Sequence, residues 1–180
     1  MANKHIFDIP FVGLKQGVHV FDYVLEEKFF VEKEAIDFAD ATANVKLSLE
    51  KNTGFMLLKF EVGGDAVVTC DKCGNALKID LWDEFKLVVK LVDNPEVMNL
   101  QEEDPDVHYI SKSDSHLDVS DWLYEFAMLS VPTQKMCSEE ERGGPKCNNE
   151  ILQKLAELNF VPKENNAGNL WKDLEKFKLN

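Results

Sequence analysis

Four cysteines carry the chemistry that this sequence specifies best. Cys70 and Cys73 form a C-x-x-C pair between two segments of alternating apolar residues, and Gly74 follows them. Two thiolates on a tight turn commonly bind zinc. A glycine in such a turn readily adopts the left-handed backbone conformation. Cys137 and Cys147 form a looser pair, with residues 138–146 between them. We therefore expect a closed, structural zinc site that is bound by all four thiolates. Such a site would hold the second half of the chain against the first.

Two other uses of the thiols remain open. A redox dithiol of the thioredoxin type lies at the start of a helix, whose dipole lowers the thiol pKa, whereas a strand pattern follows Cys73. The second alternative is a set of ordinary thiols, some of them buried as small apolar side chains. Disulfides are not expected in the cytoplasm, where thiols are kept reduced.

Signatures of catalysis are scarce. The sequence has no phosphate-binding glycine loop, nucleophile elbow or H-E-x-x-H motif. The histidines do not lie at metal-ligand spacing: His5, His19, His108 and His116. A site combining His108 or His116 with Asp106 or Asp114 is conceivable, and Cys137 as a nucleophile would need a base. We predict a non-enzymatic protein, with a thiol- or histidine-dependent enzyme as the alternative.

The segments that must position these residues resemble strands in the first half and helices in the second. Apolar residues alternate over 5–9, 17–24, 41–49, 55–62, 66–70, 77–81 and 85–91, with turns expected at 52–54 and 63–65. A helix capped by Asp118 or Ser120 should end at Leu129, and further helical patterns cover 150–159 and 170–177. The predicted fold class is α+β or mainly β, with an antiparallel β-meander body and helices in the C-terminal half. We expect one domain over residues 1–162 and a tail with a short helix over 163–180.

Composition and charge limit the function. The chain has 180 residues, of which 44% are hydrophobic, so it can bury a real core. It lacks a long uncharged apolar run and an apolar N-terminal segment, and we expect a cytoplasmic protein with no membrane association. With 20 basic and 33 acidic residues the net charge is −13, and Arg142 is the single arginine. This balance disfavours a general nucleic-acid binder, which needs a basic surface.

Much of the negative charge lies in one segment, residues 93–121. It holds nine acidic residues against Lys112 alone, which gives −8. Prolines and like charges predict an exposed, partly mobile loop. Its acidic side chains either keep the protein soluble or form a binding surface for a basic partner.

Three landmarks, in order, resemble the YceD-like family, which is named for large ribosomal RNA subunit accumulation. Val67–Cys73 is similar to the family's strand ending in C-x-R-C, with Lys72 in place of arginine. Leu117–Pro132 is similar to its helix after an acidic loop, and Asn169–Phe177 to its C-terminal stripe, without the usual proline after Asn169. Of the cysteine-rich tail found in some members, this chain keeps Cys147.

The resemblance implies a non-enzymatic role in making or maintaining the large ribosomal subunit, and it supplies no catalytic residues. Together with the charge, it leads us to expect an acidic module that binds a basic ribosomal protein or assembly factor. The alternative is direct binding of ribosomal RNA through Lys172, Lys176 and Lys178, with Trp171 available for stacking. No small-molecule substrate is indicated.

Overall fold

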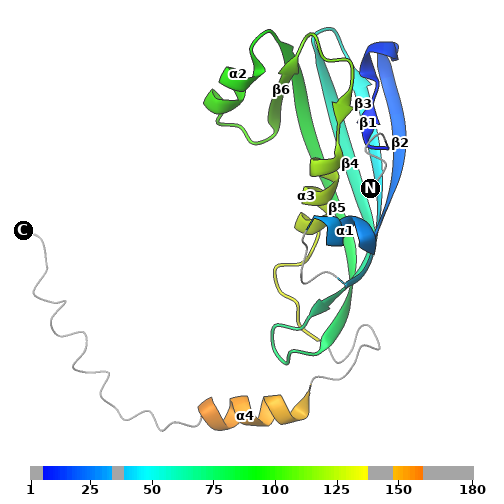
Figure 1. The fold of residues 1–180 in the computed structure, drawn as a ribbon. Coiled ribbons are helices and arrows are strands. Elements are labelled where there is room, and N and C mark those ends of the chain that lie inside the picture. The colour runs from blue at the N-terminus through cyan, green and yellow to red at the C-terminus, as the bar shows by residue number, and fades with distance from the viewer. Residues whose placement is uncertain (1–5, 34–38, 138–147, 160–180) are drawn as a thin grey trace, which may run out of the picture.

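The protein is built around one five-stranded sheet, seen in a computed structural model that describes residues 6–33, 39–137 and 148–159 (Figure 1). The strands are β2 (Gly17–Glu26), β3 (Ala39–Lys51), β4 (Phe55–Thr69), β5 (Ala76–Val92) and β6 (Val107–Ser111), in the order β2-β3-β4-β5-β6. The first four pair antiparallel, as the meander prediction requires. The predicted mainly β or α+β class is confirmed, with helices α3 (Ser120–Leu129) and α4 (Asn149–Asn159) in the C-terminal half.

Strands β4 and β5 are longer than the sequence pattern predicted. The turn expected at 63–65 does not form, and β4 continues through Gly63 and Gly64, which pair with Trp82 and Leu81 of β5. Gly64 has φ +148, and a Cβ on it would lie 2.0 Å from the Thr42 carbonyl oxygen of β3. The glycine pair therefore permits a close approach of two strands, instead of forming a turn.

The acidic segment 93–121 is also more ordered than the predicted loop. It contains α2 (Pro95–Gln101), β6, β7 (Leu117–Asp118) and the start of α3. Strand β6 runs parallel to β5 in the register Val88↔Val107, so the sheet is mixed and not purely antiparallel. Strand β7 pairs with β1 (Asp8–Ile9), which brings the N-terminal segment to the start of α3.

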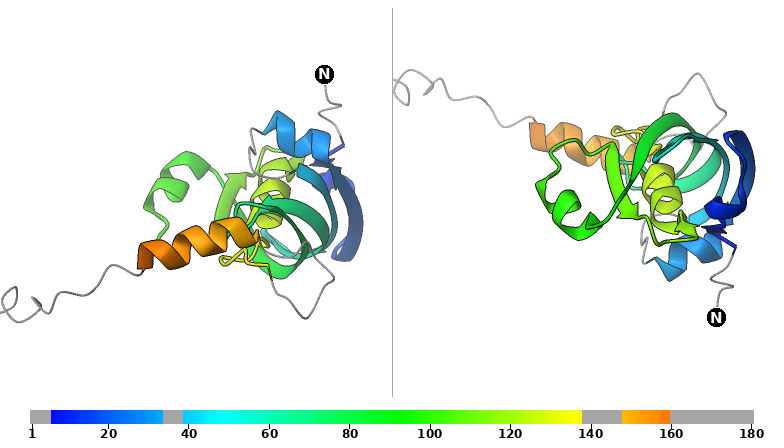
Figure 2. Two further views of the ribbon diagram at one scale, coloured as in Figure 1. Left: turned by 90° about the horizontal axis from the view of Figure 1, so that it is seen from below. Right: turned by 90° about the horizontal axis from the view of Figure 1, so that it is seen from above.

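One face of the sheet carries the core. Helix α3 lies across β4 and β5 on this inner face, and α1 (Glu27–Glu32) and η1 (Phe11–Gly13) lie near β2 and β3 (Figures 1 and 2). Phe126 of α3 stacks on Phe85 at 4.4 Å between ring centroids and meets Phe60 edge-on at 4.9 Å. The alternating residues of β3 that were expected on one face are all buried there: Ala41, Ala43, Val45, Leu47 and Leu49. The opposite, outer face is open to solvent and exposes Trp82.

The helical predictions can be compared with the described residues. Helix α3 ends at Leu129 as expected, but the predicted cap by Asp118 or Ser120 is wrong, because the N-cap is Val119 and no side chain caps the helix. The carboxylate of Asp118 accepts a hydrogen bond from the Ser120 backbone N–H at 2.8 Å. Helix α4 matches the pattern over 150–159, whereas the stripe at 170–177 lies outside the described residues. No helix in the described ranges is long and apolar enough to cross a bilayer.

Candidate metal centre

The C-x-x-C pair forms a tight turn between the two longest strands. Cys70 directly follows β4, and Cys73 lies three residues before β5 begins. The Cys70 N–H donates to the Asn75 carbonyl at 2.9 Å, and the Gly74 N–H donates to the Cys70 carbonyl at 2.9 Å. Gly74 has φ +74, the left-handed conformation expected from its place after the second cysteine. The turn thus holds both thiols at one end of the sheet.

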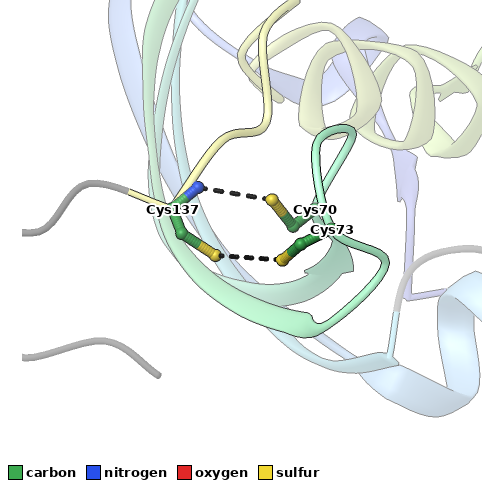
Figure 3. Close-up of side chains that lie close together, drawn as sticks. All are labelled: Cys70, Cys73 and Cys137. Carbon is green, nitrogen blue, oxygen red and sulfur yellow. Dashed lines mark hydrogen bonds between the residues drawn. The ribbon is translucent and has the colours of Figure 1, made fainter. Parts of the chain in front are cut away.

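Cys137 completes a cluster of three thiols with this turn (Figure 3). The three sulfur atoms all lie within 4.8 Å of one another. The Sγ atoms of Cys73 and Cys137 are 3.8 Å apart, and the Cys137 backbone N–H donates to Sγ of Cys70 at 3.4 Å. Cys70 and Cys73 are buried, and Cys137 is half-buried. Three of the four predicted ligands therefore come together, while Cys147 lies outside the described residues.

The turn also favours a thiolate at Cys70. Burial raises the pKa of this thiol, but hydrogen bonds from the backbone N–H groups of Cys137, Lys72 and Cys73, with a further one from the Cys137 side chain, outweigh burial. The net result is a pKa of about 6, below the ordinary value of a cysteine. Since the thiolate is the form that binds metals, the backbone prepares this ligand before any ion arrives.

The distances fit zinc. Four sulfurs at about 2.3 Å from a tetrahedral zinc are about 3.8 Å apart from each other. The separation of the Cys73 and Cys137 sulfurs has this value, and Cys70 lies within reach of the same centre. Within the described residues, this cluster is the group of histidine, cysteine or acidic side chains that could hold a metal ion.

Asp71 attaches the segment that carries Cys137. Its backbone N–H donates to the Lys135 carbonyl at 2.7 Å, and its carboxylate accepts the Lys135 N–H at 2.8 Å. The ammonium group of Lys135 lies 3.8 Å from the other carboxylate oxygen. Sequence reasoning missed this role, although an aspartate inside a tight turn is a common acceptor for backbone N–H groups. Asp71 is therefore a positioning residue for the third thiol.

We expect Asp71→Ala to weaken metal binding without removing a ligand. Without the carboxylate, the Lys135 N–H loses its acceptor and Cys137 is no longer held over the turn. Loss of such an outer contact typically lowers metal affinity by about 10–100-fold. Competition with a zinc chelator measures the change, and Lys72→Ala is the control because, within the described residues, its side chain makes no hydrogen bond or ion pair. Equal affinities for Asp71→Ala and Lys72→Ala would contradict the positioning role.

The histidines do not join this centre. His108 packs edge-on against Trp122 of α3 at 5.2 Å between centroids, and burial lowers its pKa. The His19 ring contacts the Lys15 carbonyl, and the His116 ring contacts Ser115. His5 lies outside the described residues. In the part of the chain that the structure describes, no histidine belongs to a cluster of three possible metal ligands.

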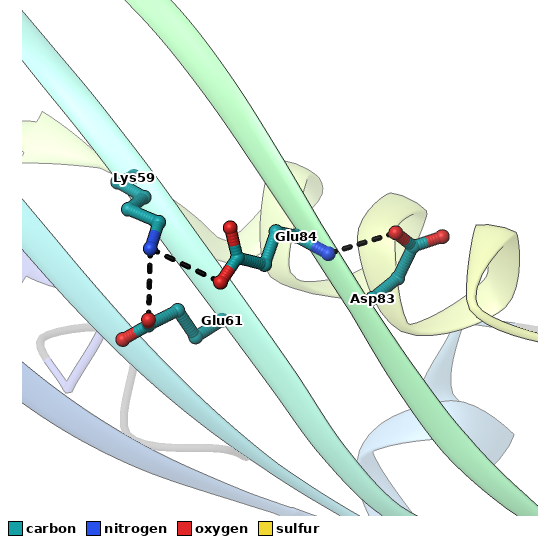
Figure 4. A network of polar contacts seen from close by, with 4 residues as sticks. All are labelled: Lys59, Glu61, Asp83 and Glu84. Carbon is teal, nitrogen blue, oxygen red and sulfur yellow. Dashed lines mark hydrogen bonds and ion pairs between the residues drawn. The ribbon is translucent and has the colours of Figure 1, made fainter.

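Two lysines of the outer face are paired with acidic groups. Lys59 of β4 donates to Glu61 at 2.9 Å and to Glu84 of β5 at 3.1 Å, and these hydrogen bonds raise its pKa (Figure 4). Lys78 pairs with Asp65 at 3.0 Å. Pairs of this kind are exposed and contribute little stability, but they cancel positive charge. At Lys59 and Lys78, the pairs therefore reduce the positive charge that could attract a phosphate backbone.

A comparison with protein families identifies a relationship over most of the chain. The family model described as Large ribosomal RNA subunit accumulation protein YceD matches residues 58–178, which include most of β4, the cysteine turn, β5 and α3. No curated protein and no solved structure matches the chain.

Proposed function

The chain belongs to the YceD family, and from this premise we propose that it supports accumulation of the large ribosomal RNA by binding a basic protein of the large subunit or of its assembly. The family description names ribosomal RNA accumulation and names no chemical reaction. The match over residues 58–178 is the observation that carries the proposal.

Charge supports a basic protein as the direct partner. The net charge of −13 opposes contact with naked RNA but attracts ribosomal proteins, which are strongly basic. The acidic segment is attached to the edge of the sheet, because its strand β6 pairs with β5. The backbone that carries its carboxylates is therefore held in place by the sheet. Complementary charge of this kind accelerates association and selects partners more than it adds affinity.

We further propose that zinc fixes the cysteine end of the sheet. Cys70, Cys73 and Cys137 would hold the ion, with Cys147 as the fourth thiolate that closes the site. A closed site of four thiolates is structural and leaves no position for a substrate. Zinc at this place would keep the segment after α3 attached to the end of β4.

We expect the purified full chain to retain specific large-subunit proteins at low salt. The probe is the protein fraction stripped from large subunits with concentrated lithium chloride and treated with nuclease. Retention should fall steeply between 50 and 300 mM salt, because exposed charges are screened over a Debye length of about 10 Å at 0.1 M. Mass spectrometry of the retained proteins identifies the partner.

Naked large-subunit RNA is the second arm of the same experiment. Binding of RNA with no retained protein would replace our proposal with direct RNA recognition. In cells, depletion of the chain should lower the ratio of large to small ribosomal RNA, and the wild-type chain should restore it. An unchanged ratio would contradict a role in accumulation.

A further inference from the structure

Helix α2 is unusual among the described helices that lie against the sheet, because it buries none of its own residues. It projects from the end of β5 and β6, away from α3 (Figures 1 and 2). Its apolar side chains lie in solvent: Leu100 is 87% exposed and Val97 is 53% exposed. A short helix without buried apolar contacts is not stabilised by a core, so other contacts must hold it.

Polar contacts from one side of α2 hold it to β6. The Asn99 amide donates to the Tyr109 carbonyl at 2.9 Å and accepts the Tyr109 N–H at 2.8 Å, as the peptide group of a neighbouring strand would do. The Tyr109 hydroxyl donates to Glu102 at 2.5 Å, and the Lys90 ammonium lies 5.3 Å from the Tyr109 ring centroid. Asn99 lies in the last turn of α2 and Glu102 directly follows the helix, so the C-terminal end of α2 is the part attached to β6.

The exposed surface of α2 carries apolar side chains. Val97 and Leu100 are three positions apart, so they lie next to each other on the helix. Both side chains are more than half exposed, so they face solvent and not the sheet. The polar attachment therefore keeps two large apolar side chains in water.

The sequence on both sides of this apolar pair is acidic. Residues 93–106 contain six acidic residues and no lysine or arginine: Asp93, Glu96, Glu102, Glu103, Asp104 and Asp106. Asp93 pairs with Lys112 at 3.0 Å, and Glu102 receives the Tyr109 hydroxyl. In the described structure, the carboxylates of Glu96, Glu103 and Asp106 have no hydrogen-bond donor or cation beside them. Exposed apolar side chains in a segment of one charge sign are typical of a protein interface.

We propose that the outward face of α2 is the docking surface for a basic protein segment that places an apolar side chain between Val97 and Leu100. This proposal rests on the function proposed above and assigns its partner a place on the fold. The apolar pair would provide the anchor, and the exposed carboxylates of Glu96, Glu103 and Asp106 would pair with lysine or arginine side chains of the partner. The Asn99 attachment holds α2 before binding, which reduces the entropy lost on association.

The test uses the full chain and the same stripped large-subunit proteins. Val97→Ser combined with Leu100→Ser should reduce the retained partner by at least about tenfold, because truncation of a central anchor commonly costs more than that in affinity. Glu96→Gln, Glu103→Gln and Asp106→Asn together should weaken retention at low salt and flatten its salt dependence. Neither variant replaces a buried side chain, and thermal unfolding checks that both remain folded.

The matched control is Val18→Ser combined with Val20→Ser, which removes two similarly exposed valines from β2. This variant should retain the partner as the wild type does. If the wild type retains a large-subunit protein and the α2 variants do so equally well, the α2 surface is wrong while the proposed function stands. If the wild type retains none, or retains only RNA, the proposed function fails and the docking surface fails with it.

Discussion

Gly64→Ala is expected to destabilise the protein by about 2–4 kcal/mol, which is a large fraction of the stability of a typical domain. Two effects act together at this position. An alanine does not favour φ +148, and its Cβ would lie 2.0 Å from the Thr42 carbonyl oxygen. That oxygen belongs to the backbone of β3, so relief requires the two strands to separate. Urea unfolding followed by circular dichroism measures the loss.

Gly63→Ala is the matched control, because it lies on the same strand one residue earlier. A Cβ at Gly63 has no neighbour within 4 Å, and its φ lies outside the left-handed range. We expect the free energy of unfolding of this variant to lie within about 1 kcal/mol of the wild-type value, since alanine also restricts the unfolded chain. Equal urea midpoints for Gly64→Ala and the wild type would show that β3 and β4 do not approach each other as closely as described.

The alternating apolar pattern predicted most of the sheet. A strand with one buried face must place apolar residues at every second position, so the pattern follows directly from burial. Leu47, Leu49 and their neighbours on β3 alternate with polar residues, and such a pattern is stable only as a strand with one buried face. The pattern did not show where strands end. Gly63 and Gly64 are typical of a turn, and only the position of Thr42 on another strand shows why β4 needs glycine there.

Contacts between distant residues could not be predicted in this way. Strand β6 has five residues in a highly acidic segment, and its parallel pairing with β5 depends on the crossover through α2. In the candidate site, too, the local geometry could be predicted and the long-range contact could not. The turn geometry of Cys70 and Cys73 followed from local spacing and Gly74, whereas Asp71 and Lys135 meet across 64 residues of sequence. Their contact brings Cys137 to the turn, and no local pattern specifies it.

Strand β5 links the two proposed features of the molecule, the thiol cluster and α2. Cys73 lies three residues before β5 begins, and α2 begins three residues after β5 ends. The 17 residues of β5 pair with β4 along 15 positions, which makes this connection a rigid one. The thiol cluster and α2 therefore lie at opposite ends of β5, and the cluster is not part of the α2 surface.

We expect purified wild-type protein to contain about one equivalent of zinc, and Cys73→Ser to contain far less. Cys73 is buried and its sulfur lies 3.8 Å from that of Cys137, so a serine there removes a central ligand. The sheet has its own core, so the variant should stay folded but lose roughly 5–10 °C in Tm. Hydrogen exchange should accelerate mainly in residues 70–75 and 130–137, where the metal would tie the chain together. Elemental analysis of protein purified without chelators gives the metal content.

Cys147→Ser decides how the site is closed. If four thiolates hold the ion, this variant should lose zinc as Cys73→Ser does, because a structural zinc site is four-coordinate. If it keeps a full equivalent, three thiolates and a water hold the metal, and Cys147 is not a ligand. Lys72→Ala lies in the same turn and should keep both the metal and the Tm. Zinc well below one equivalent in the wild type, with the same Tm for Cys70→Ser, would remove the metal from this fold and leave Asp71 as the main attachment of the Cys137 segment.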